Sequence, residues 1–317
     1  METKISPTHI NSPPVPNTGN CSGGNFCNIT KDLTGQVIII TGANTGIGKE
    51  TARRLAYTGA TIIFACRDQA KTLPVIQEIQ QETKNSHLEF IRLDIGDLAS
   101  IKEFVKEFQQ RHQKLNILIN NAGINIPERK LTKDGFECQF GINHLGPFYL
   151  TTLCLDTLKN SSPSRIINVA SNAHEDAKIN WEDLMSEKEY SMLPAYGQSK
   201  LATVLFTKEL SRRLESSNVK VVCLHPGAVR TELTRDIAKK WIFKVILAIA
   251  RPFQKSPEEG AQTTIYCALE DEEKLVGGAY YVDLKVKKEN SLARNEENGR
   301  RMWEVSEKLI SEKVGRL

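Results

Sequence analysis

Tyr196 and Lys200 stand four residues apart, a spacing that can support proton-transfer chemistry. If they share a helix, the two side chains lie on one face about one turn apart. An ammonium group there favours the phenolate and lowers the pKa of the tyrosine towards neutrality, as a proton donor to a carbonyl group requires. The pattern is weak evidence by itself, because a chain of this composition holds about half a match by chance.

A second pair with the same spacing, Tyr281 and Lys285, lies in a different context. It falls in residues 279–286, whose sequence AYYVDLKV is typical of a strand. In a strand, positions i and i+4 are ~13 Å apart, which is too far for direct coupling. We therefore expect this second pair to take no part in catalysis.

A glycine-rich segment, residues 41–48 (TGANTGIG), lies between an expected strand and an expected helix. There, backbone N–H groups and a helix N-terminus would meet the pyrophosphate of a dinucleotide, and glycines permit the close approach. Three glycines at this spacing arise by chance roughly 0.1 times in such a chain. The segment is not a P-loop, because Glu50 follows Lys49 where a serine or threonine would hold magnesium. An ordinary tight turn is the alternative interpretation.

The end of the second expected strand bears on the choice of cofactor. Arg67 follows that strand directly, and Lys49 follows the glycine turn. A ribose 2′-phosphate prefers basic residues at this place, whereas a free 2′-hydroxyl meets an acidic one. Asp68 is the competing feature, but it lies further along the chain and can pair with a surface cation. The sequence therefore favours NADP over NAD.

Three polar positions follow other expected elements. Ser171 comes directly after the expected strand 165–170, at the sheet edge where open α/β folds bind ligands. Its hydroxyl can hydrogen-bond a carbonyl oxygen and stabilise a developing alkoxide, although a loop serine alone is more typical of a turn. Residues 120–123 (NNAG) end another strand and either stop the sheet or line a nicotinamide pocket. Asn143 follows an expected helix start, where asparagine is typical of a cap.

These residues need a scaffold, and the chain alternates near-continuous apolar strands with helical stretches. Such alternation is typical of a parallel sheet covered on both faces. We predict a doubly wound α/β fold of the Rossmann type, in a single domain over residues 32–290. The strands are expected at residues 36–41, 60–66, 88–93, 117–120, 165–170 and 219–224, and the helices at 51–57, 98–111 and 200–214.

The two ends of the chain differ from this domain. Residues 1–31 are rich in Pro, Asn, Ser, Thr and Gly without apolar periodicity, which is typical of a disordered tail or a loosely docked arm. Residues 291–317 are charged, with apolar side chains at helical spacing, and are expected to form an amphipathic helical extension of the same domain. We assign no chemistry to either segment.

Composition and charge exclude several classes of function. The chain has 42 basic and 38 acidic residues, and its net charge of +4 is too small to favour nucleic acid as a partner. No stretch approaches the ~18–20 apolar residues of a membrane-spanning helix, and the first 30 residues hold no apolar block like that of a signal peptide. The seven cysteines include no C-x-x-C pair, so we expect a reducing, cytoplasmic setting and no metal site.

Taken in order, these segments resemble the short-chain dehydrogenase/reductase superfamily. Its marks in this chain are TGANTGIG (41–48), NNAG (120–123), Asn143, Ser171, YGQSK (196–200) and PGAVRT (226–231). Further segments are similar to the retinol dehydrogenase (retinal reductase) branch, among them FACRD (64–68), INHLGPF (142–148) and RIINVASNAH (165–174). Membrane-bound members of that branch carry an amino-terminal apolar anchor, where this chain has a polar tail.

The resemblance implies a role for each matched residue. Tyr196 would be the general acid/base, and Lys200 would lower its pKa and hold the ribose hydroxyls. Ser171 would position the carbonyl, and Asn143 would hold a water that links Lys200 to solvent. The implied cofactor-binding residues, besides Tyr196 and Lys200, are Gly42, Asn44, Thr45, Gly46, Ile47, Gly48 and Lys49 at the phosphates, Arg67 at the 2′-phosphate, Asp94 and Ile95 near the adenine, Asn121, Ala122 and Gly123 at the adenosine ribose, and Pro226, Gly227, Val229 and Thr231 at the nicotinamide carboxamide.

Residues 236–253 (DIAKKWIFKVILAIARPF) are expected to form an amphipathic helix that is too short to span a bilayer. We interpret residues 234–253 as a lid over an apolar substrate pocket, and contact with an intracellular membrane surface stays open. Packing into the core or against a second subunit is the alternative. Ile124, Ile126 and Leu193 would crowd the same pocket, so we expect a small lipophilic carbonyl compound or alcohol as substrate.

Three functions are compatible with the sequence. The favoured one is an NADP-dependent carbonyl reductase or alcohol dehydrogenase, because all four reacting positions are present. The second is a nucleotide sensor that binds NADP(H) without turnover. The third is an NADPH reductase of a ring double bond, such as that of protochlorophyllide. The physiological substrate, the direction of flux and the oligomeric state do not follow from the fold.

Overall fold

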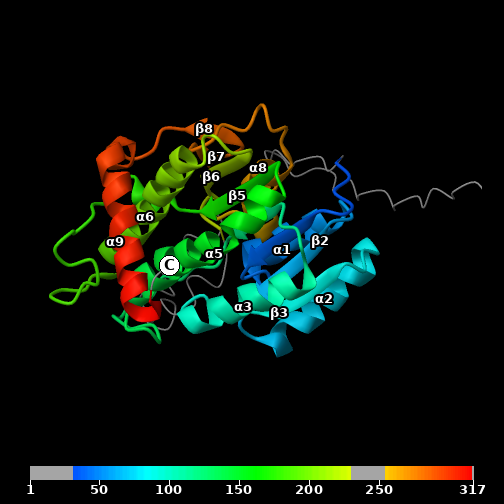
Figure 1. Ribbon diagram of the computed structural model, residues 1–317, viewed down its shortest axis with the longest axis horizontal. Coiled ribbons are helices and arrows are strands. Elements are labelled where there is room, and N and C mark those ends of the chain that lie inside the picture. Colours follow the sequence, from blue (N-terminus) through cyan, green and yellow to red (C-terminus); the bar gives the residue numbers. More distant parts are fainter. Residues whose placement is uncertain (1–30, 230–253, 316–317) are drawn as a thin grey trace, which may run out of the picture.

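The computed structural model describes residues 31–229 and 254–315 of the chain. At its centre, eight strands form one sheet in the order β3-β2-β1-β4-β5-β6-β7-β8 (Figure 1). Strands β1 to β7 pair in parallel, and β8 runs antiparallel to β7. The strands are β1 (Val37–Thr41), β2 (Thr61–Cys66), β3 (Leu88–Arg92), β4 (Ile117–Asn120), β5 (Ser164–Val169), β6 (Val219–His225), β7 (Tyr280–Val282) and β8 (Lys285–Lys287).

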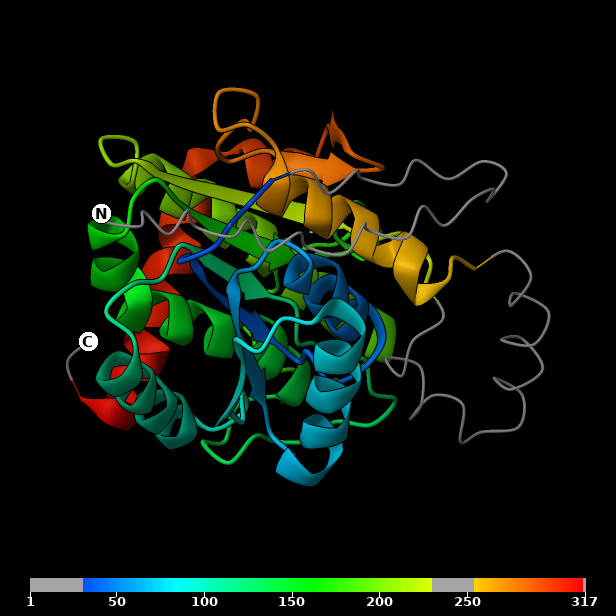
Figure 2. The same cartoon turned by 90° about the vertical axis from the view of Figure 1, so that its right-hand side faces the viewer.

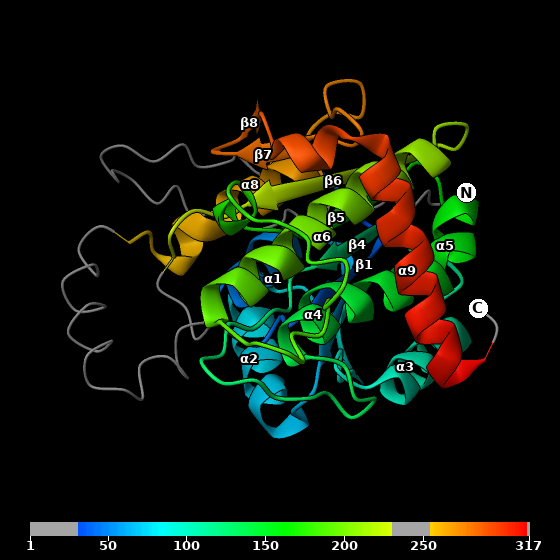
Figure 3. The ribbon, with the colours of Figure 1, turned by 90° about the vertical axis from the view of Figure 1, so that its left-hand side faces the viewer.

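Helices cover both faces of this sheet. α1, α2 and α8 lie on one face (Figure 2), whereas α3, α5 and α6 lie on the other, with α9 packed against α6 on its outer side (Figure 3). The longer helices are α1 (Gly46–Ala56), α2 (Gln69–Thr83), α3 (Leu98–Arg111), α5 (Gly146–Asn160), α6 (Met192–Arg213), α8 (Pro257–Leu269) and α9 (Glu296–Val314). The predicted doubly wound α/β fold is confirmed.

The central strand β1 shows why the strands are apolar throughout. Ile38 and Ile40 belong to a core cluster with Leu55 of α1 and Ile265 of α8. The intervening Ile39 belongs to a second cluster on the opposite face, with Phe148 of α5. All six side chains are fully buried. Because both faces are covered, neither alternate set of side chains can be polar.

Residues 279–286 differ from the single strand that the sequence predicts. They form a tight hairpin instead, because Asp283 and Leu284 adopt positive φ angles of 48° and 66° and reverse the chain between β7 and β8. Neither residue is the glycine or asparagine that normally marks such a turn. Tyr281 is buried and accepts a hydrogen bond from the backbone of Val276 at 2.9 Å, while Lys285 is exposed. The two side chains therefore form no acid/base pair.

Two helices begin earlier than predicted. α1 starts at Gly46 and not at residue 51, so the second half of the glycine-rich segment is already helical. α6 starts at Met192 and not at residue 200, and it places both Tyr196 and Lys200 inside one helix. Helices α2, α5 and α8 were not predicted from the sequence.

The outer segments are described only in part. Residues 1–30 of the expected tail and the whole expected lid, 234–253, lie outside the described residues. At the other end, the expected amphipathic helix is present as α9, which buries Met302, Trp303 and Ile310. Within residues 31–229 and 254–315, no helix is long and apolar enough to cross a membrane, and no disulfide joins the cysteines.

His144 occupies the core between α5 and α9. Its Nε2 lies 2.8 Å from the hydroxyl of Ser306, which itself donates to the carbonyl of Met302 at 2.7 Å. The Ser306 hydrogen is therefore engaged, so His144 Nε2 carries the proton and donates it to Ser306. Burial lowers the pKa of His144 to about 3. The ring is thus neutral in the folded protein across the physiological range.

Acid is expected to destabilise the protein through this histidine. The unfolded chain binds a proton at His144 below pH ~6.5, but the folded chain binds it only near pH 3. The contribution of neutral His144 to the free energy of unfolding is therefore complete above pH ~6.5. Below that pH it falls by about 1.4 kcal/mol for each unit of pH. His144→Gln should flatten the slope of unfolding free energy against pH between 6.5 and 5, measured by urea denaturation. H87Q, at an exposed histidine, controls for the substitution itself. Equal slopes for the protein and His144→Gln would contradict this expectation.

Candidate active site

A cavity of about 450 Å³ opens at the carboxyl ends of β1, β4, β5 and β6. The strand order reverses between β1 and β4, and open α/β sheets bind ligands at such a switch point. Sixteen of the residues expected at the cofactor or substrate line this cavity: Gly42, Thr45, Gly46, Ile47, Gly48, Asn121, Ala122, Gly123, Ile124, Ile126, Ser171, Tyr196, Lys200, Pro226, Gly227 and Val229.

The glycine turn forms one wall of the cavity. Gly42 and Gly46 adopt positive φ angles of 67° and 53°, a conformation that side chains disfavour. A Cβ atom on Gly48 would lie 2.3 Å from the Gly42 carbonyl oxygen, closer than atoms can approach. Thr45 precedes α1 and makes no side-chain cap bond, and the first turn of α1 holds no acidic residue. The backbone N–H groups at this helix start suit an anion such as a pyrophosphate.

Asn121 braces this turn from the end of β4. Its side-chain Nδ2 donates to the Thr41 carbonyl at 2.8 Å. The backbone N–H groups of Asn121 and Ala122 both donate to the Thr41 hydroxyl at 2.9 Å. The Asn121 side chain is thus used to join β4 to the glycine turn, and the backbone that follows it lines the cavity.

Tyr196 and Lys200 lie one turn apart in α6 and both are buried. The Lys200 Nζ is 5.8 Å from the centre of the Tyr196 ring and donates to the Val169 carbonyl at 2.9 Å. A Cβ on Gly123 would lie 3.4 Å from the same Nζ, so a larger residue there would crowd the lysine. The ammonium group is thereby held between the ends of β4 and β5.

Ser171 follows β5 and faces the same cavity. It caps a short 3₁₀ turn, η2 (Asn172–His174), and its hydroxyl oxygen accepts the Ala173 N–H at 3.2 Å. The hydroxyl donates to Asn172 Oδ1 at 3.3 Å, and it lies near enough to Tyr196 to act on the pKa of that phenol. The structure therefore brings Ser171, Tyr196 and Lys200 together at one end of the cavity.

Burial dominates the titration of this group. It raises the pKa of Tyr196 to about 12, and the hydrogen bond with Ser171 acts in the opposite direction. It also lowers the pKa of Lys200 to about 8. The sequence predicts that Lys200 lowers the pKa of Tyr196; in the structure, desolvation of the buried phenol is the largest effect on that pKa and raises it. Tyr196 is consequently protonated at neutral pH, the form that donates a proton to a carbonyl oxygen.

Asn143 lies beside the cavity and not on its wall. It belongs to a π-helical turn, η1 (Gly141–Leu145), where its Nδ2 donates to the Ile124 carbonyl and the Ser199 hydroxyl at 3.0 Å each. Its Oδ1 accepts the Ile124 N–H at 2.8 Å. Both ends of the amide are engaged, so the side chain fastens the loop after β4 to α6 next to Lys200.

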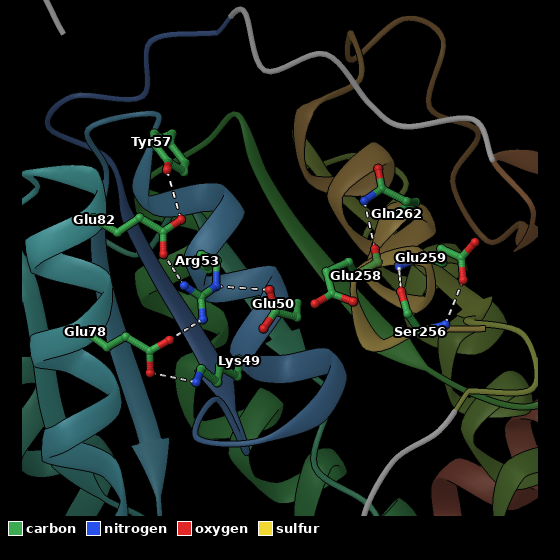
Figure 4. Close-up of polar contacts among 10 residues, drawn as sticks. All are labelled: Lys49, Glu50, Arg53, Tyr57, Glu78, Glu82, Ser256, Glu258, Glu259 and Gln262. Atoms are coloured by element: carbon green, nitrogen blue, oxygen red, sulfur yellow. Dashed lines mark hydrogen bonds and ion pairs between the residues drawn. The ribbon is translucent and has the colours of Figure 1, made fainter. Parts of the chain in front are cut away.

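Lys49 points away from the cavity. Its Nζ forms an ion pair of 2.8 Å with Glu78 of α2 (Figure 4). Arg53, one turn further along α1, pairs with Glu50, Glu78 and Glu82, and these carboxylates hold the pKa of Arg53 above its usual range. Lys49 is therefore part of a charged network that joins α1 to α2.

Other expected cofactor residues also lie outside the cavity lining. Arg67 follows β2 with its side chain 71% exposed, and its Nη1 lies 3.9 Å from Asp94 Oδ2. Ile95 is buried beside Asp94, and Asn44 is half-buried within the glycine turn. Thr231 lies outside the described residues.

Comparison with known proteins decides the family. The sequence model of the family described as short chain dehydrogenase matches residues 36–241. The chain belongs to this family. Its relatives include retinol dehydrogenase 12 from Mus musculus, 44% identical over 287 residues and 90% of each chain, and retinol dehydrogenase 13 from Homo sapiens, 45% identical over 291 residues, 90% of this chain and 88% of that one. The short-chain dehydrogenase described here is thus an oxidoreductase of the retinol dehydrogenase-like type.

Solved structures agree with this assignment. An uncharacterized protein from Mycobacterium paratuberculosis is 34% identical and superposes with a TM-score of 0.73, over 90% of this dehydrogenase and 97% of that chain. A 3-ketoacyl-(acyl-carrier-protein) reductase from Brucella melitensis, complexed with NADH, is 25% identical with a TM-score of 0.61, over 78% and 96%. The RhlG/NADP complex from Pseudomonas aeruginosa, at 23% identity and a TM-score of 0.64 over 78% and 94%, shares the fold. Both of the latter structures are complexes with a nicotinamide dinucleotide, NADH in one and NADP in the other.

Several lining residues of the dehydrogenase were not predicted: Asn125, Val169, Ala170, Asn172, His225, Ala228 and Gln254. Val169, Ala170 and His225 lie at the carboxyl ends of β5 and β6, so the rule that ligands bind there was a sufficient signal. Burial lowers the pKa of His225 to about 4, and its Nδ1 has no hydrogen-bond partner in the described part of the chain. Leu193 was expected in the pocket but is 66% exposed and does not line it, because it lies on the outer side of the first turn of α6.

Proposed function

We propose that this dehydrogenase interconverts a carbonyl group and an alcohol on a lipophilic substrate, with NADP(H) as its cofactor. The observation that carries the proposal is the meeting of Tyr196, Ser171 and Lys200 with the glycine turn in one cavity. Its relatives named retinol dehydrogenases support a substrate of retinoid type.

The residues present fit a dinucleotide. The turn at Gly42–Gly48 has no space for a side chain at Gly48, and its helix start offers N–H groups to the pyrophosphate. The backbone of Ala122 and Gly123 would lie along the adenosine ribose side, and residues 226–229 would contact the carboxamide. A bound nicotinamide cofactor supplies the hydride for the reduction.

The proton comes from the protein. Tyr196 donates its phenolic proton to the carbonyl oxygen, while Ser171 donates a hydrogen bond to the same oxygen and stabilises the developing negative charge. Lys200 places an ammonium group near the phenolate that forms, and its own hydrogen bond to the Val169 carbonyl holds it in position. Oxidation of the alcohol runs through the same groups in reverse.

Arg67 is the residue that favours NADP. It stands at the carboxyl end of β2, exposed, and within the described residues its ion pair is the long contact to Asp94 at 3.9 Å. Lys49, by contrast, is held by Glu78 at 2.8 Å. We therefore assign the 2′-phosphate to Arg67 and not to Lys49, because a guanidinium group recognises phosphate through paired N–H donors.

Arg67→Ala is expected to raise the KM for NADPH roughly tenfold or more and to leave the KM for NADH within about twofold. The reason is the loss of a charge-assisted hydrogen bond worth ~1.5–3 kcal/mol to a phosphate that NADH lacks. Lys49→Ala is the matched control and should change the KM for NADPH less. Equal changes for both cofactors, or a larger effect of Lys49→Ala, would assign the phosphate elsewhere.

Two apolar side chains of the cavity wall suit a lipophilic substrate. Ile124 and Ile126 line the cavity from the loop after β4. The function is tested by following reduced-nicotinamide absorbance with NADPH and then NADH, over a panel that includes retinal and short aliphatic aldehydes. A higher kcat/KM for retinal than for short aldehydes supports a lipophilic substrate, and the reverse order refutes it. Tight NADPH binding without turnover of any aldehyde or ketone would favour a sensor.

A further inference from the structure

Ser171 is tied to a buried histidine three residues further on. His174 is fully buried, and its Nδ1 lies 2.6 Å from the backbone oxygen of Ser171. A carbonyl oxygen can only accept, so Nδ1 carries the hydrogen and donates it. In the neutral ring, Nε2 is then an acceptor, and the backbone N–H of Asn290 donates to it at 3.4 Å. Both ring nitrogens are therefore engaged, and one tautomer is fixed.

The Asn290 side chain clamps the same turn. Its Nδ2 donates to the carbonyl oxygens of His174 and Glu175 at 2.8 Å each and to that of Ala177 at 3.0 Å. Its Oδ1 accepts the Leu292 N–H at 2.7 Å, which fixes the orientation of the amide. One side chain from the segment after β8 thus fastens the whole turn that follows Ser171.

The hairpin β7–β8 supports this turn from the same side. The His174 ring packs edge-on against Tyr280, with ring centres 4.6 Å apart. Glu175 forms a 3.1 Å ion pair with Lys287, and the Tyr280 hydroxyl lies 3.5 Å from the same carboxylate. Because the imidazole is enclosed, burial lowers the pKa of His174 and keeps the ring neutral.

These contacts fix the backbone that carries the Ser171 hydroxyl. The Ser171 carbonyl accepts two hydrogen bonds, from the His174 backbone N–H at 3.2 Å and from Nδ1 at 2.6 Å. The hydroxyl accepts the Ala173 N–H at 3.2 Å and donates to Asn172 Oδ1 at 3.3 Å. With its carbonyl held, the Ser171 backbone cannot rotate freely, so its Cα–Cβ bond keeps its place beside the cavity, and Oγ is held by the turn itself.

We propose that His174 and Asn290 are positioning residues, which keep Ser171 at its place beside Tyr196. They do so by fastening the turn that follows β5 to the segment that follows β8. The proposal rests on the function proposed above, in which Ser171 binds the carbonyl oxygen. Neither residue lines the cavity, so neither touches the substrate or the cofactor.

The test is a double-mutant cycle in the full-length protein. His174→Ala should lower kcat for the best aldehyde of the panel by roughly 10- to 100-fold, because a misplaced reacting group costs about that much, with the KM for NADPH within about twofold. In a Ser171→Ala background, the same His174→Ala change should lower kcat less than about threefold. If the fold-loss of kcat in the double variant equals the product of the losses in the two single variants, His174 does not act through Ser171, and the proposal is overturned.

Conservative and control variants separate positioning from general stability. His174→Asn keeps an amide donor where Nδ1 lies, so it should recover most of the activity that His174→Ala loses. Asn290→Ala should lower kcat like His174→Ala. Asn85→Ala is its matched control, since Asn85 is also buried and donates to two carbonyls, of Ala56 and Ala60, far from the site. Equal kcat losses for Asn290→Ala and Asn85→Ala would reduce Asn290 to a structural role.

Hydrogen exchange gives a readout that needs no activity. His174→Ala and Asn290→Ala should speed amide exchange in peptides covering residues 171–177 and leave peptides from β1 and α1 unchanged. If no aldehyde is turned over by the unmodified protein, the proposed function fails while this measurement still decides on the clamp. Unchanged exchange at residues 171–177 in both variants would refute the clamp.

Discussion

Tyr196→Phe is expected to lower kcat for carbonyl reduction by roughly 10²- to 10⁴-fold, the contribution of a positioned general acid. The substitution removes one oxygen and keeps the buried ring, so the packing of α6 is preserved. Because the pKa of Tyr196 is about 12, the phenol of the unmodified protein is protonated and ready to donate throughout the neutral range. The measurement is NADPH oxidation with a saturating aldehyde, together with NADPH binding by fluorescence.

Two controls, NADPH affinity and a substitution at a second tyrosine, show whether the loss of activity comes from the missing proton donor. NADPH affinity should stay within about twofold, since the phenol oxygen contributes to chemistry more than to cofactor binding. Tyr149→Phe is the control, because Tyr149 is a buried tyrosine of α5 that does not line the cavity. Retention of more than about a tenth of the activity in Tyr196→Phe would assign the proton to another group.

Gly48→Ala is expected to weaken NADPH binding by roughly 100-fold, because the added methyl group displaces N–H groups whose hydrogen bonds to phosphate are worth ~1.5–3 kcal/mol each. The new Cβ would lie 2.3 Å from the Gly42 carbonyl and 2.5 Å from Asn121 Nδ2. Both are held by the frame around Thr41, so neither can withdraw without moving the turn. Overpacking of this kind also costs about 1–3 kcal/mol of stability.

A glycine elsewhere provides the comparison. Gly299 lies inside α9, where an added Cβ meets nothing closer than the Glu209 side chain at 3.4 Å, an ordinary contact. Gly299→Ala should therefore keep cofactor affinity and raise stability by about 0.5–1 kcal/mol, because alanine favours the helix. Isothermal titration with NADPH and denaturant midpoints measure both effects. Equal NADPH affinities for Gly48→Ala and the unmodified protein would place the pyrophosphate away from this turn.

The fold was predictable because buried parallel strands leave a strong local pattern. Segments such as VIIIT at β1 and ILIN at β4 are apolar at every or nearly every position, and only burial on both faces explains that. The hairpin at Asp283–Leu284 was not predictable, since its positive φ angles occur at residues that give no such signal. Helix α8 was missed because buried polar residues, Gln262, Thr263 and Thr264, interrupt its apolar pattern.

The site likewise has features that the sequence predicts and features that it does not. Ser171, Tyr196 and Lys200 could be named because each follows a strand end or shares a helix face, both local properties. The environment of Lys49 could not be predicted, because its partner Glu78 lies on another helix, 29 residues away in the sequence. The pKa of Tyr196 depends on how deeply the fold buries the phenol, and the sequence contains no measure of that burial.

The clamp at Asn290 has a consequence for the order in which the enzyme matures. The parts that suit a nucleotide, β1, the glycine turn and α1, leave the ribosome first, whereas Asn290 and the helix α9 that backs α6 come near the end of the described chain. A domain generally folds as a unit. A chain cut short after β8 would therefore keep every described residue that lines the cavity and still lack the side chain that orients Ser171, so competence for turnover would depend on the last segments to be synthesised.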